Sequence, residues 1–208
     1  MYLPAQFDRP EDAHGLMRGH PFASLVSVDD DGLPFVSHLP LHLQVDEKGA
    51  RLLGHCAKLN PHWRYLQARP AALATFMGPY AYMSPAVYPD IARVPTWNYL
   101  AVHAKVLARL IEADAAKDAV LKQLIADHEP AYAKRWRELP QEYTDKMLQG
   151  IVAFELQITQ VQCKVKLNQH RPESHAAMFE AYDAGTAQEQ ALAVWMRQLG
   201  MVPATGNE

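Results

Sequence analysis

The sequence lacks the features that mark secreted and membrane proteins. Only 2 cysteines, Cys56 and Cys163, occur in 208 residues, so a disulfide framework is not expected. The first residues, MYLPAQFDRP, contain neither a basic region nor an apolar stretch, which argues against a signal peptide. No apolar run approaches the roughly 20 residues that cross a bilayer. We therefore expect a cytoplasmic protein with buried thiols and no membrane partner.

Positive charge is also scarce. The formal net charge is −3 at pH 7, and Lys and Arg are scattered apart from short clusters at 134–137 and 164–166. Domains that bind DNA usually carry a concentrated basic face. Direct binding to DNA is therefore doubtful.

Several catalytic motifs are missing as well. The chain has no glycine-rich phosphate loop, no C-x-x-C pair, no H-E-x-x-H and no serine elbow. These absences argue against a P-loop NTPase, a Rossmann oxidoreductase, a zinc protease and an α/β-hydrolase. Although there are 10 histidines, no metal site is expected. His38 and His42 would share one face of a strand, but no third ligand lies near them in the sequence.

What the sequence does contain is a series of short apolar segments separated by turns. Phe22–Val28 is apolar and ends at Asp-Asp-Asp-Gly, residues 35–45 alternate loosely, and residues 50–55 follow a second turn at 46–49. Strands so closely spaced predict antiparallel pairing, as a β-meander. With 49% hydrophobic residues, the chain is expected to bury a real core.

The rest of the chain adds helices to these strands. A short helix is expected at 10–18 with Asp8 as its cap, and another after Asn60. Further strands are predicted at 71–77, at Thr96–Ile111 and at 151–167, with a proline-rich loop at 80–95. Helical patterns occupy 112–128 (capped by Asp114), the stretch after Pro130 and 173–199 with a break near Gly185, before a frayed tail at 203–208. The predicted class is mainly β with helical additions (α+β).

Polar and aromatic clusters stand at the ends of these strands. They are HLP at 38–40, GHCAKLNPHW at 54–63, FMGPYAYMSP at 76–85, VPTWNY at 94–99 and KLNQ at 166–169. In this order they resemble the PaiB-like family of FMN-binding proteins, which are described as negative transcriptional regulators. The resemblance runs from Met1 to Gln169. The chain departs from the family's usual SPxWY at Ala86-Val87-Tyr88 and from its KLSQN at Asn168.

The resemblance implies a fold and an assembly. The family adopts the FMN-binding split β-barrel, of antiparallel Greek-key type, and two subunits hold FMN at the dimer interface. Residues 1–170 would then form the FMN-binding domain, with a helical insert at about 113–149 that either covers the site or extends the dimer contact. Residues 171–208 would form a C-terminal helical extension.

The resemblance also indicates which residues meet the cofactor. Lys58 and Asn60 are expected at the phosphate, with N–H groups of the following helix. Neutral imidazole can be held at one nitrogen and donate to the cofactor at the other. The residues predicted to bind FMN are His38, Leu39, Pro40, His55, Lys58, Asn60, Tyr82, Ser84, Trp97, Asn98, Tyr99, Lys166 and Gln169. Trp97, Asn98 and Tyr99 are expected to come from the partner subunit.

Each of these residue types has a plainer interpretation. A lone lysine is usually solvated, a histidine in a strand is often buried against backbone, and a tryptophan usually packs in a core or interface. Three functions stay open: a flavin-binding regulator, an FMN-dependent oxidoreductase that uses NAD(P)H on a small molecule, and a haem-binding protein with His103 or His170 as axial ligand. No catalytic residue is predicted, so the sequence leaves open whether the protein is an enzyme.

Overall fold

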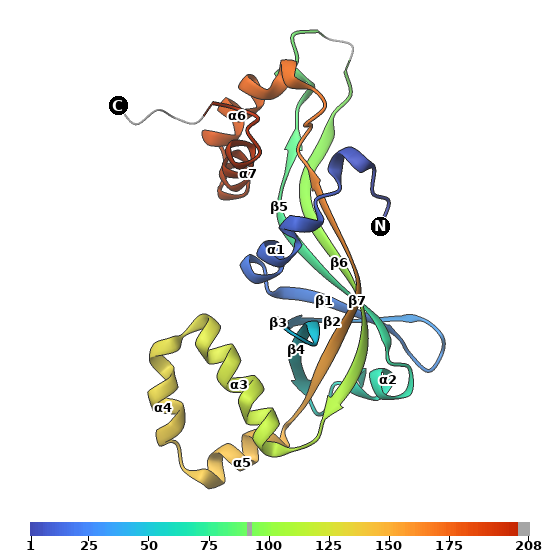
Figure 1. The fold of residues 1–208 in the computed structure, drawn as a ribbon, viewed down its shortest axis with the longest axis vertical. Coiled ribbons are helices and arrows are strands. Elements are labelled where there is room, and N and C mark those ends of the chain that lie inside the picture. Colours follow the sequence, from blue (N-terminus) through green and yellow to red (C-terminus); the bar gives the residue numbers. More distant parts are fainter. Residues whose placement is uncertain (91–92, 204–208) are drawn as a thin grey trace. The chain divides into compact units, whose positions relative to one another are not determined.

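The computed structural model (Figure 1) describes residues 1–90 and 93–203. The chain divides into two compact units, which share its long strands. The barrel unit comprises Met17–Phe76 and His103–Val161, and the terminal unit comprises Met1–Leu16 together with the described parts of Met77–Val102 and Gln162–Glu208. The domain division at residue 170 stays a prediction.

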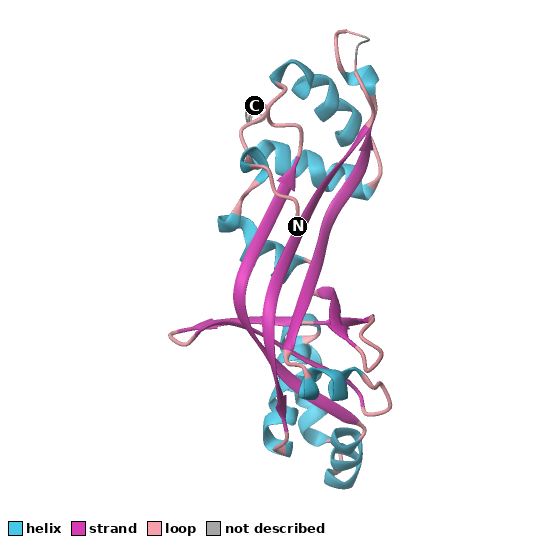
Figure 2. Cartoon of the chain, turned by 90° about the vertical axis from the view of Figure 1, so that its right-hand side faces the viewer, coloured by secondary structure: helices cyan, strands magenta, loops and turns pink. Residues whose placement is uncertain are grey.

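A seven-stranded sheet organises the chain, in the order β2-β1-β5-β6-β7-β4-β3. The strands are β1 Phe22–Val28, β2 Pro34–Pro40, β3 His42–Asp46, β4 Gly49–Ala57, β5 Ala71–Met83, β6 Thr96–Ile111 and β7 Ile151–Lys166. The registered pairs of β1 with β2 and β5, and of β4 with β3 and β7, are antiparallel. β5, β6 and β7 are the long strands of Figure 2. The predicted class, mainly β with helices, is confirmed, but the strand order is not a meander.

The first hairpin forms as its turn residues dictate. Asp29 Oδ1 accepts hydrogen bonds from the N–H groups of Asp31 (3.0 Å) and Leu33 (2.8 Å). Gly32 has φ 80°, a conformation that glycine adopts without steric cost. β1 therefore ends at Val28, as predicted, and pairs with β2 along its whole length.

The predicted strand at 35–45 is wrong in one respect, because the structure divides it into β2 and β3. Pro40 has no N–H and ends β2, and the N–H of Leu41 donates to Pro21 O at 2.9 Å instead of to a strand. β2 pairs with β1, whereas β3 pairs with β4. Residues 34–46 therefore contribute one strand to each end of the sheet, with β2 at one end of the strand order and β3 at the other.

The predicted end of β5 is also wrong. β5 continues through Gly78 and Pro79 to Met83, so residues 80–83 are strand and not loop. β1 is registered with β5 only at Leu73–Thr75, and a proline is tolerated where one side of a strand has no partner. After Ser84, a 3₁₀ turn at Pro85–Val87 follows. Residues 91–92 of the predicted loop lie outside the described residues.

The helices agree with the predicted segments but not with two of the predicted caps. Asp8 bridges to Lys164 instead of capping a helix, and Ala113 occupies the cap position that Asp114 was expected to fill. The break near Gly185 is confirmed, and Thr186 and Glu189 form a capping box after it. The helices are α1 Ala13–Gly19, α2 His62–Ala68, α3 Asp114–His128, α4 Ala133–Glu138, α5 Gln141–Gln149, α6 His175–Asp183 and α7 Ala187–Gln198. Residues 204–208 of the predicted tail lie outside the described residues.

Each unit has its own buried residues. The barrel unit buries Leu25, Leu52, Phe76, Phe154 and Leu156, and the terminal unit buries Met83, Leu100, Val165, Met178 and Met196. Both cysteines are free and buried, as predicted. Burial raises the pKa of the Cys56 thiol to about 11. Within residues 1–90 and 93–203, no helix is both long and apolar enough to span a membrane.

Gly54 is required by close packing in the barrel unit. A Cβ at this position would lie 2.6 Å from Leu41 Cδ2 and 3.0 Å from Phe154 Cε2, and both neighbours are fully buried. We expect Gly54→Ala to lower the free energy of unfolding by about 2 kcal/mol, because the rigid ring of Phe154 must move. Urea unfolding measures this loss. Gly15→Ala, where the new methyl group meets no atom within 4 Å beyond its chain neighbours and the backbone of α1, is the control. Equal stability of both variants would contradict the packing argument.

Candidate functional site

A cationic loop follows β4 in the barrel unit. Lys58 is exposed, and the indole Nε1 of Trp63 donates to its carbonyl oxygen at 3.0 Å. The Lys58 N–H donates to Gly150 O at 2.8 Å, which holds the loop in place. The guanidinium of Arg64 lies 5.2 Å from the centre of the Trp63 ring. We call residues 58–64 the cationic loop, in which Lys58 precedes α2 and Trp63 and Arg64 belong to its first turn. Arg64 was not among the predicted residues.

Asn60 is occupied inside this loop. Its Nδ2 donates to Ser37 Oγ at 3.0 Å, and its Oδ1 accepts from the His62 N–H at 3.0 Å. Both ends of the amide thus connect the loop to β2 and to the start of α2. The Oδ1 of Asn60 therefore takes the first N–H of α2, and one of the two Nδ2 hydrogens is also used.

His62 is a buried titratable group that the sequence analysis did not select. It is fully buried, its Nδ1 lies 2.8 Å from Ser37 Oγ, and the ring of Phe35 meets it edge-on at 5.1 Å. Burial lowers the pKa of His62 to about 4. Only its place two residues after Asn60, at the start of an expected helix, was visible in the sequence.

His38 lies on the exposed face of the β1–β2 hairpin. It stands opposite Ser24 in the strand register, and its Nδ1 lies 3.0 Å from Ser24 Oγ. Phe22 stacks on the imidazole at 6.4 Å with an interplanar angle of 30°. One ring nitrogen is therefore held while Nε2 stays available, the arrangement that a ligand-binding imidazole needs. Leu39 and Pro40 follow it, partly buried, to the end of β2.

His55 lies on β4, partly buried in the barrel unit. Burial, and to a lesser extent repulsion from His42, lowers the pKa of His55. The imidazole is therefore favoured in its neutral form, which can donate from one nitrogen and accept at the other.

The terminal unit presents an aromatic face, which we define as Met77, Tyr80, Tyr82, Trp97 and Tyr99. Trp97 is 53% exposed, and its ring contacts Tyr80 at 6.3 Å and Tyr82 at 6.1 Å. Met77, Tyr80 and Tyr99 line a shallow apolar cavity of about 470 Å³. Large apolar side chains gathered on one exposed face mark an interaction site.

Lys166 is fixed at the edge of this face. Its Nζ donates to Thr96 Oγ1 at 2.6 Å and to Trp97 O at 2.8 Å, and lies 5.9 Å from the centre of the Tyr99 ring. Lys164, two residues earlier, approaches the same ring at 5.2 Å. Burial, with repulsion from Lys164, lowers the pKa of Lys166. Two cations therefore converge on Tyr99.

Three predicted residues of the terminal unit are engaged internally. Asn98 is fully buried, and its Nδ2 donates to Tyr182 Oη at 2.9 Å. Ser84 Oγ accepts from the Ala86 N–H, and Gln169 bonds both Val165 O and the Leu167 N–H. These side chains therefore stabilise their own segments, and their contact with FMN stays a prediction.

The chain's departure at Asn168 has a structural reason. Asn168 has φ 63°, a left-handed conformation that asparagine tolerates better than most residues. Its Nδ2 donates to Tyr88 Oη at 2.9 Å and to Ser174 Oγ at 2.8 Å. The two segments where the chain departs from the family pattern thus contact each other.

The chain is similar to known proteins in sequence. The family described as "Putative FMN-binding domain" matches residues 1–160. The chain is 32% identical over 181 residues, 84% of each chain, to the protease synthase and sporulation protein PAI 2 of Bacillus subtilis strain 168.

Solved structures share the fold at low identity. The flavocytochrome Anf3 of Azotobacter vinelandii has a TM-score of 0.61 and 18% identity, over 78% of this chain and 71% of that one. The FAD and haem binding protein of Mycobacterium smegmatis has a TM-score of 0.60 and 20% identity, over 76% and 71%. The split-barrel fold is confirmed. The family match and the identity to PAI 2 show that the chain belongs to the PaiB-like family of FMN-binding split-barrel proteins.

Proposed function

We propose that the protein binds FMN at the interface of a homodimer, where one copy supplies the cationic loop and the other supplies the aromatic face. The observation that carries this proposal is the contrast between the two exposed groups. The cationic loop carries Lys58 and Arg64, and the aromatic face is apolar with two lysines beside it. FMN has the same contrast, because its phosphate is dianionic and its ring is flat and apolar.

At the phosphate end, Lys58 and Arg64 are the donors. Lys58 is exposed, and no ion pair with any residue of the described chain neutralises it. Charge-assisted bonds to phosphate are about twice as strong as neutral ones. Asn60 acts indirectly, because it holds the loop through Ser37 and His62.

At the ring end, His38, Leu39, Pro40 and His55 of the same copy contact the flavin. The Ser24 contact fixes the His38 ring and leaves Nε2 free to bond the polar edge of the flavin. Leu39 and Pro40 add apolar contact at the point where β2 ends.

The second copy contributes the aromatic face and Lys166. Trp97 and Tyr82 are about half exposed in a single chain, which is costly for large aromatic side chains unless a ligand or partner covers them. Lys166, whose pKa is lowered by burial, is held by Thr96 close to this face.

Bound FMN supplies hydride and electron transfer, and a regulator that senses redox state needs no further catalytic group. PAI 2 is named for protease synthesis and sporulation. We propose a regulatory role for this protein, without direct contact to DNA. The free buried thiols support a cytoplasmic location.

The absorbance spectrum of the purified protein tests the proposal. We expect flavin bands, saturable binding of added FMN, and the mass of two chains by light scattering. A Soret band in place of flavin bands would favour the haem alternative, with His103 or His170 as ligand. A colourless single chain without affinity for FMN would refute the proposal.

Trp97 is expected to contribute to dimerisation. We expect Trp97→Ala to weaken the dimer at least tenfold, because tryptophan is a frequent energetic centre of interfaces. Sedimentation equilibrium measures the dissociation constant. Val194→Ala, which removes a 47% exposed side chain from α7 of the same unit, is the control and should leave the dimer intact. An unchanged dimer in the Trp97 variant would place the interface elsewhere.

A further inference from the structure

Two lysine side chains at the end of β7 approach the same aromatic ring of the terminal unit. Lys164 Nζ lies 5.2 Å and Lys166 Nζ lies 5.9 Å from the centre of the Tyr99 ring. Residues two apart on a strand point to the same side, so β7 brings both ammonium groups to the aromatic face. Like charges placed so close together repel each other. Such a pair is expected where a function requires it.

Among the described residues, no carboxylate forms an ion pair with either lysine. Lys164 Nζ donates to Tyr2 O at 3.1 Å, and Lys166 Nζ donates to oxygens of Thr96 and Trp97. All three acceptors are neutral oxygen atoms. The hydrogen bonds of the two ammonium groups therefore hold them in place without compensating their charge.

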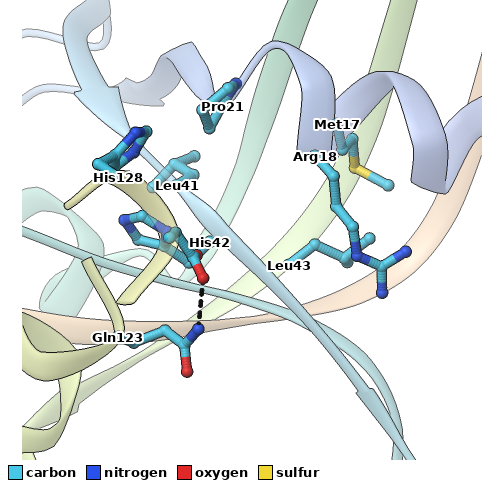
Figure 3. Close-up of a pocket in the computed structure, with 9 residues that line it drawn as sticks. Met17, Arg18, Pro21, Leu41, His42, Leu43, Gln123 and His128 are labelled. Atoms are coloured by element: carbon cyan, nitrogen blue, oxygen red, sulfur yellow. Dashed lines mark hydrogen bonds and ion pairs between the residues drawn. The ribbon is translucent and has the colours of Figure 1, made fainter. Parts of the chain in front are cut away.

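A polar cluster of the barrel unit shows the opposite arrangement. In the cavity of Figure 3, one oxygen of Asp127 lies 2.6 Å from His42 Nδ1, and the other accepts from Gln123 Nε2 at 2.7 Å, the dashed line. Beside Tyr99 the nearest comparable group is Asp8, which lies opposite Lys164 in a backbone bridge. Even with this carboxylate counted, one of the two ammonium charges would stay uncompensated.

The two ammonium groups keep donors for a ligand. Each has three N–H donors, of which Lys166 uses two and Lys164 uses one. Lys166 is partly buried and can contact a ligand directly, whereas Lys164 is 6% exposed and acts through its charge. Lys166 is partly desolvated and repelled by Lys164, and both effects lower its pKa. A negative charge close by would oppose them.

The flavin ring gains a negative charge only when it is reduced. The proposed function places the ring, and not the phosphate, at the aromatic face. The oxidised ring is neutral. A hydride donor delivers two electrons and one proton to N5, so the reduced ring carries one negative charge, shared by N1 and the oxygen on C2. Charged groups near these atoms are a means by which proteins adjust a flavin.

We propose that Lys164 and Lys166 raise the reduction potential of the bound flavin by stabilising the negative charge of its reduced ring. Lys166 acts at the edge of the aromatic face, where Thr96 holds its ammonium group, and Lys164 adds a second positive charge. The proposal rests on the proposed function, because it requires the ring at this face. It gives a role to Lys164, which was not among the predicted site residues. A raised potential suits a sensor, since the bound flavin is then reduced more completely by a given reductant.

A redox titration of the FMN-loaded full chain, with a reference dye, tests this proposal. We expect Lys166→Met to weaken the binding of reduced FMN about tenfold more than that of oxidised FMN, which lowers the midpoint potential by about 30 mV. Lys164→Met should shift it in the same direction, since methionine keeps an apolar stem and removes the charge. Lys166→Arg, which restores the charge, should recover most of the loss. Lys134→Met, on exposed α4, is the matched control and should leave the potential unchanged.

Riboflavin, titrated in parallel, separates the ring from the phosphate. Because it has the same ring and no phosphate, Lys166→Met should lower its potential as much as that of FMN. If Lys166→Met instead weakens FMN binding, leaves riboflavin binding intact and keeps the potential, the lysines hold the phosphate and the proposal is wrong.

The remaining outcomes separate this proposal from the proposed function. An unchanged potential in Lys166→Met, with FMN still bound, overturns the role of the lysines and leaves the flavin site intact. An equal fall in Lys134→Met would show an effect of overall charge, which also overturns it. If the unaltered chain binds no flavin, both proposals are wrong. Lys166 is only partly buried, so its variant decides the test even if the buried Lys164 cannot be replaced without unfolding.

Discussion

Acidification is expected to destabilise the protein by about 3 kcal/mol through the single imidazole of His62. Burial lowers the pKa of this folded-state group to about 4, from 6.5 in an exposed histidine. Below pH 6.5, His62 is therefore protonated in the unfolded chain while it stays neutral in the folded chain. Stability falls as the pH drops from 6.5 and stops falling on this account near pH 4. About three fifths of the loss occurs above pH 5, before most carboxylates titrate.

Other histidines act in the same direction. Burial also lowers the pKa of His20, His55, His103 and His170, so the total acid loss exceeds the share of His62. His62→Asn isolates that share, because asparagine can keep a bond to Ser37 but does not titrate. Urea unfolding of both proteins at pH 7.5 and at pH 5 gives the four free energies of unfolding that the comparison needs.

The free energy of unfolding lost between pH 7.5 and pH 5 should be about 2 kcal/mol smaller in His62→Asn than in the unaltered protein. His14→Asn, which removes a partly buried imidazole from α1, is the control and should keep the full difference. If His62→Asn loses as much stability on acidification as the unaltered chain, the ring is not held neutral and the buried environment described for it is incorrect.

The strands were predictable from the sequence wherever a turn had its own chemistry. The Asp-Asp-Asp-Gly turn predicted the end of β1, and the long run of β-forming residues predicted both ends of β6. Proline was misleading, because its effect depends on the neighbouring strand. Pro40 ends β2, whereas Pro79 lies inside β5 beyond the residues registered with β1. Which strand lies beside which residue is a long-range property that local patterns do not contain.

The same limit applies to the candidate site. Lys58, His38 and Trp97 lie on exposed surfaces, as residues that contact a ligand must. Asn98 belongs to the same motif as Trp97 but is buried, because it bonds Tyr182, 84 positions away. His42 was set aside as lacking partners, yet it meets Asp127 from 85 positions away. Side-chain partners so distant along the chain become visible only in the folded structure.

FMN affinity is expected to fall about a hundredfold when Lys58 and Arg64 are both replaced by glutamine. Each cation contributes a charge-assisted bond to the phosphate, and losing one costs about tenfold or more. Both side chains are exposed, so the fold should tolerate the change. Quenching of flavin fluorescence on binding gives the dissociation constant. Raising the salt concentration should reduce the difference in FMN affinity between the double variant and the unaltered protein.

Riboflavin separates the phosphate contact from every other effect of these substitutions. It has the ring and the ribityl chain but no phosphate, so the double variant should bind it as well as the unaltered protein does. Lys134→Gln with Arg135→Gln removes the same two charges from exposed positions on α4 and should change neither affinity. If the Lys58/Arg64 variant loses riboflavin and FMN equally, the loop shapes the ring pocket and the phosphate binds elsewhere. If it keeps full affinity for FMN, the cationic loop has no part in the site. Removing two positive charges next to a dianionic phosphate would lower the affinity.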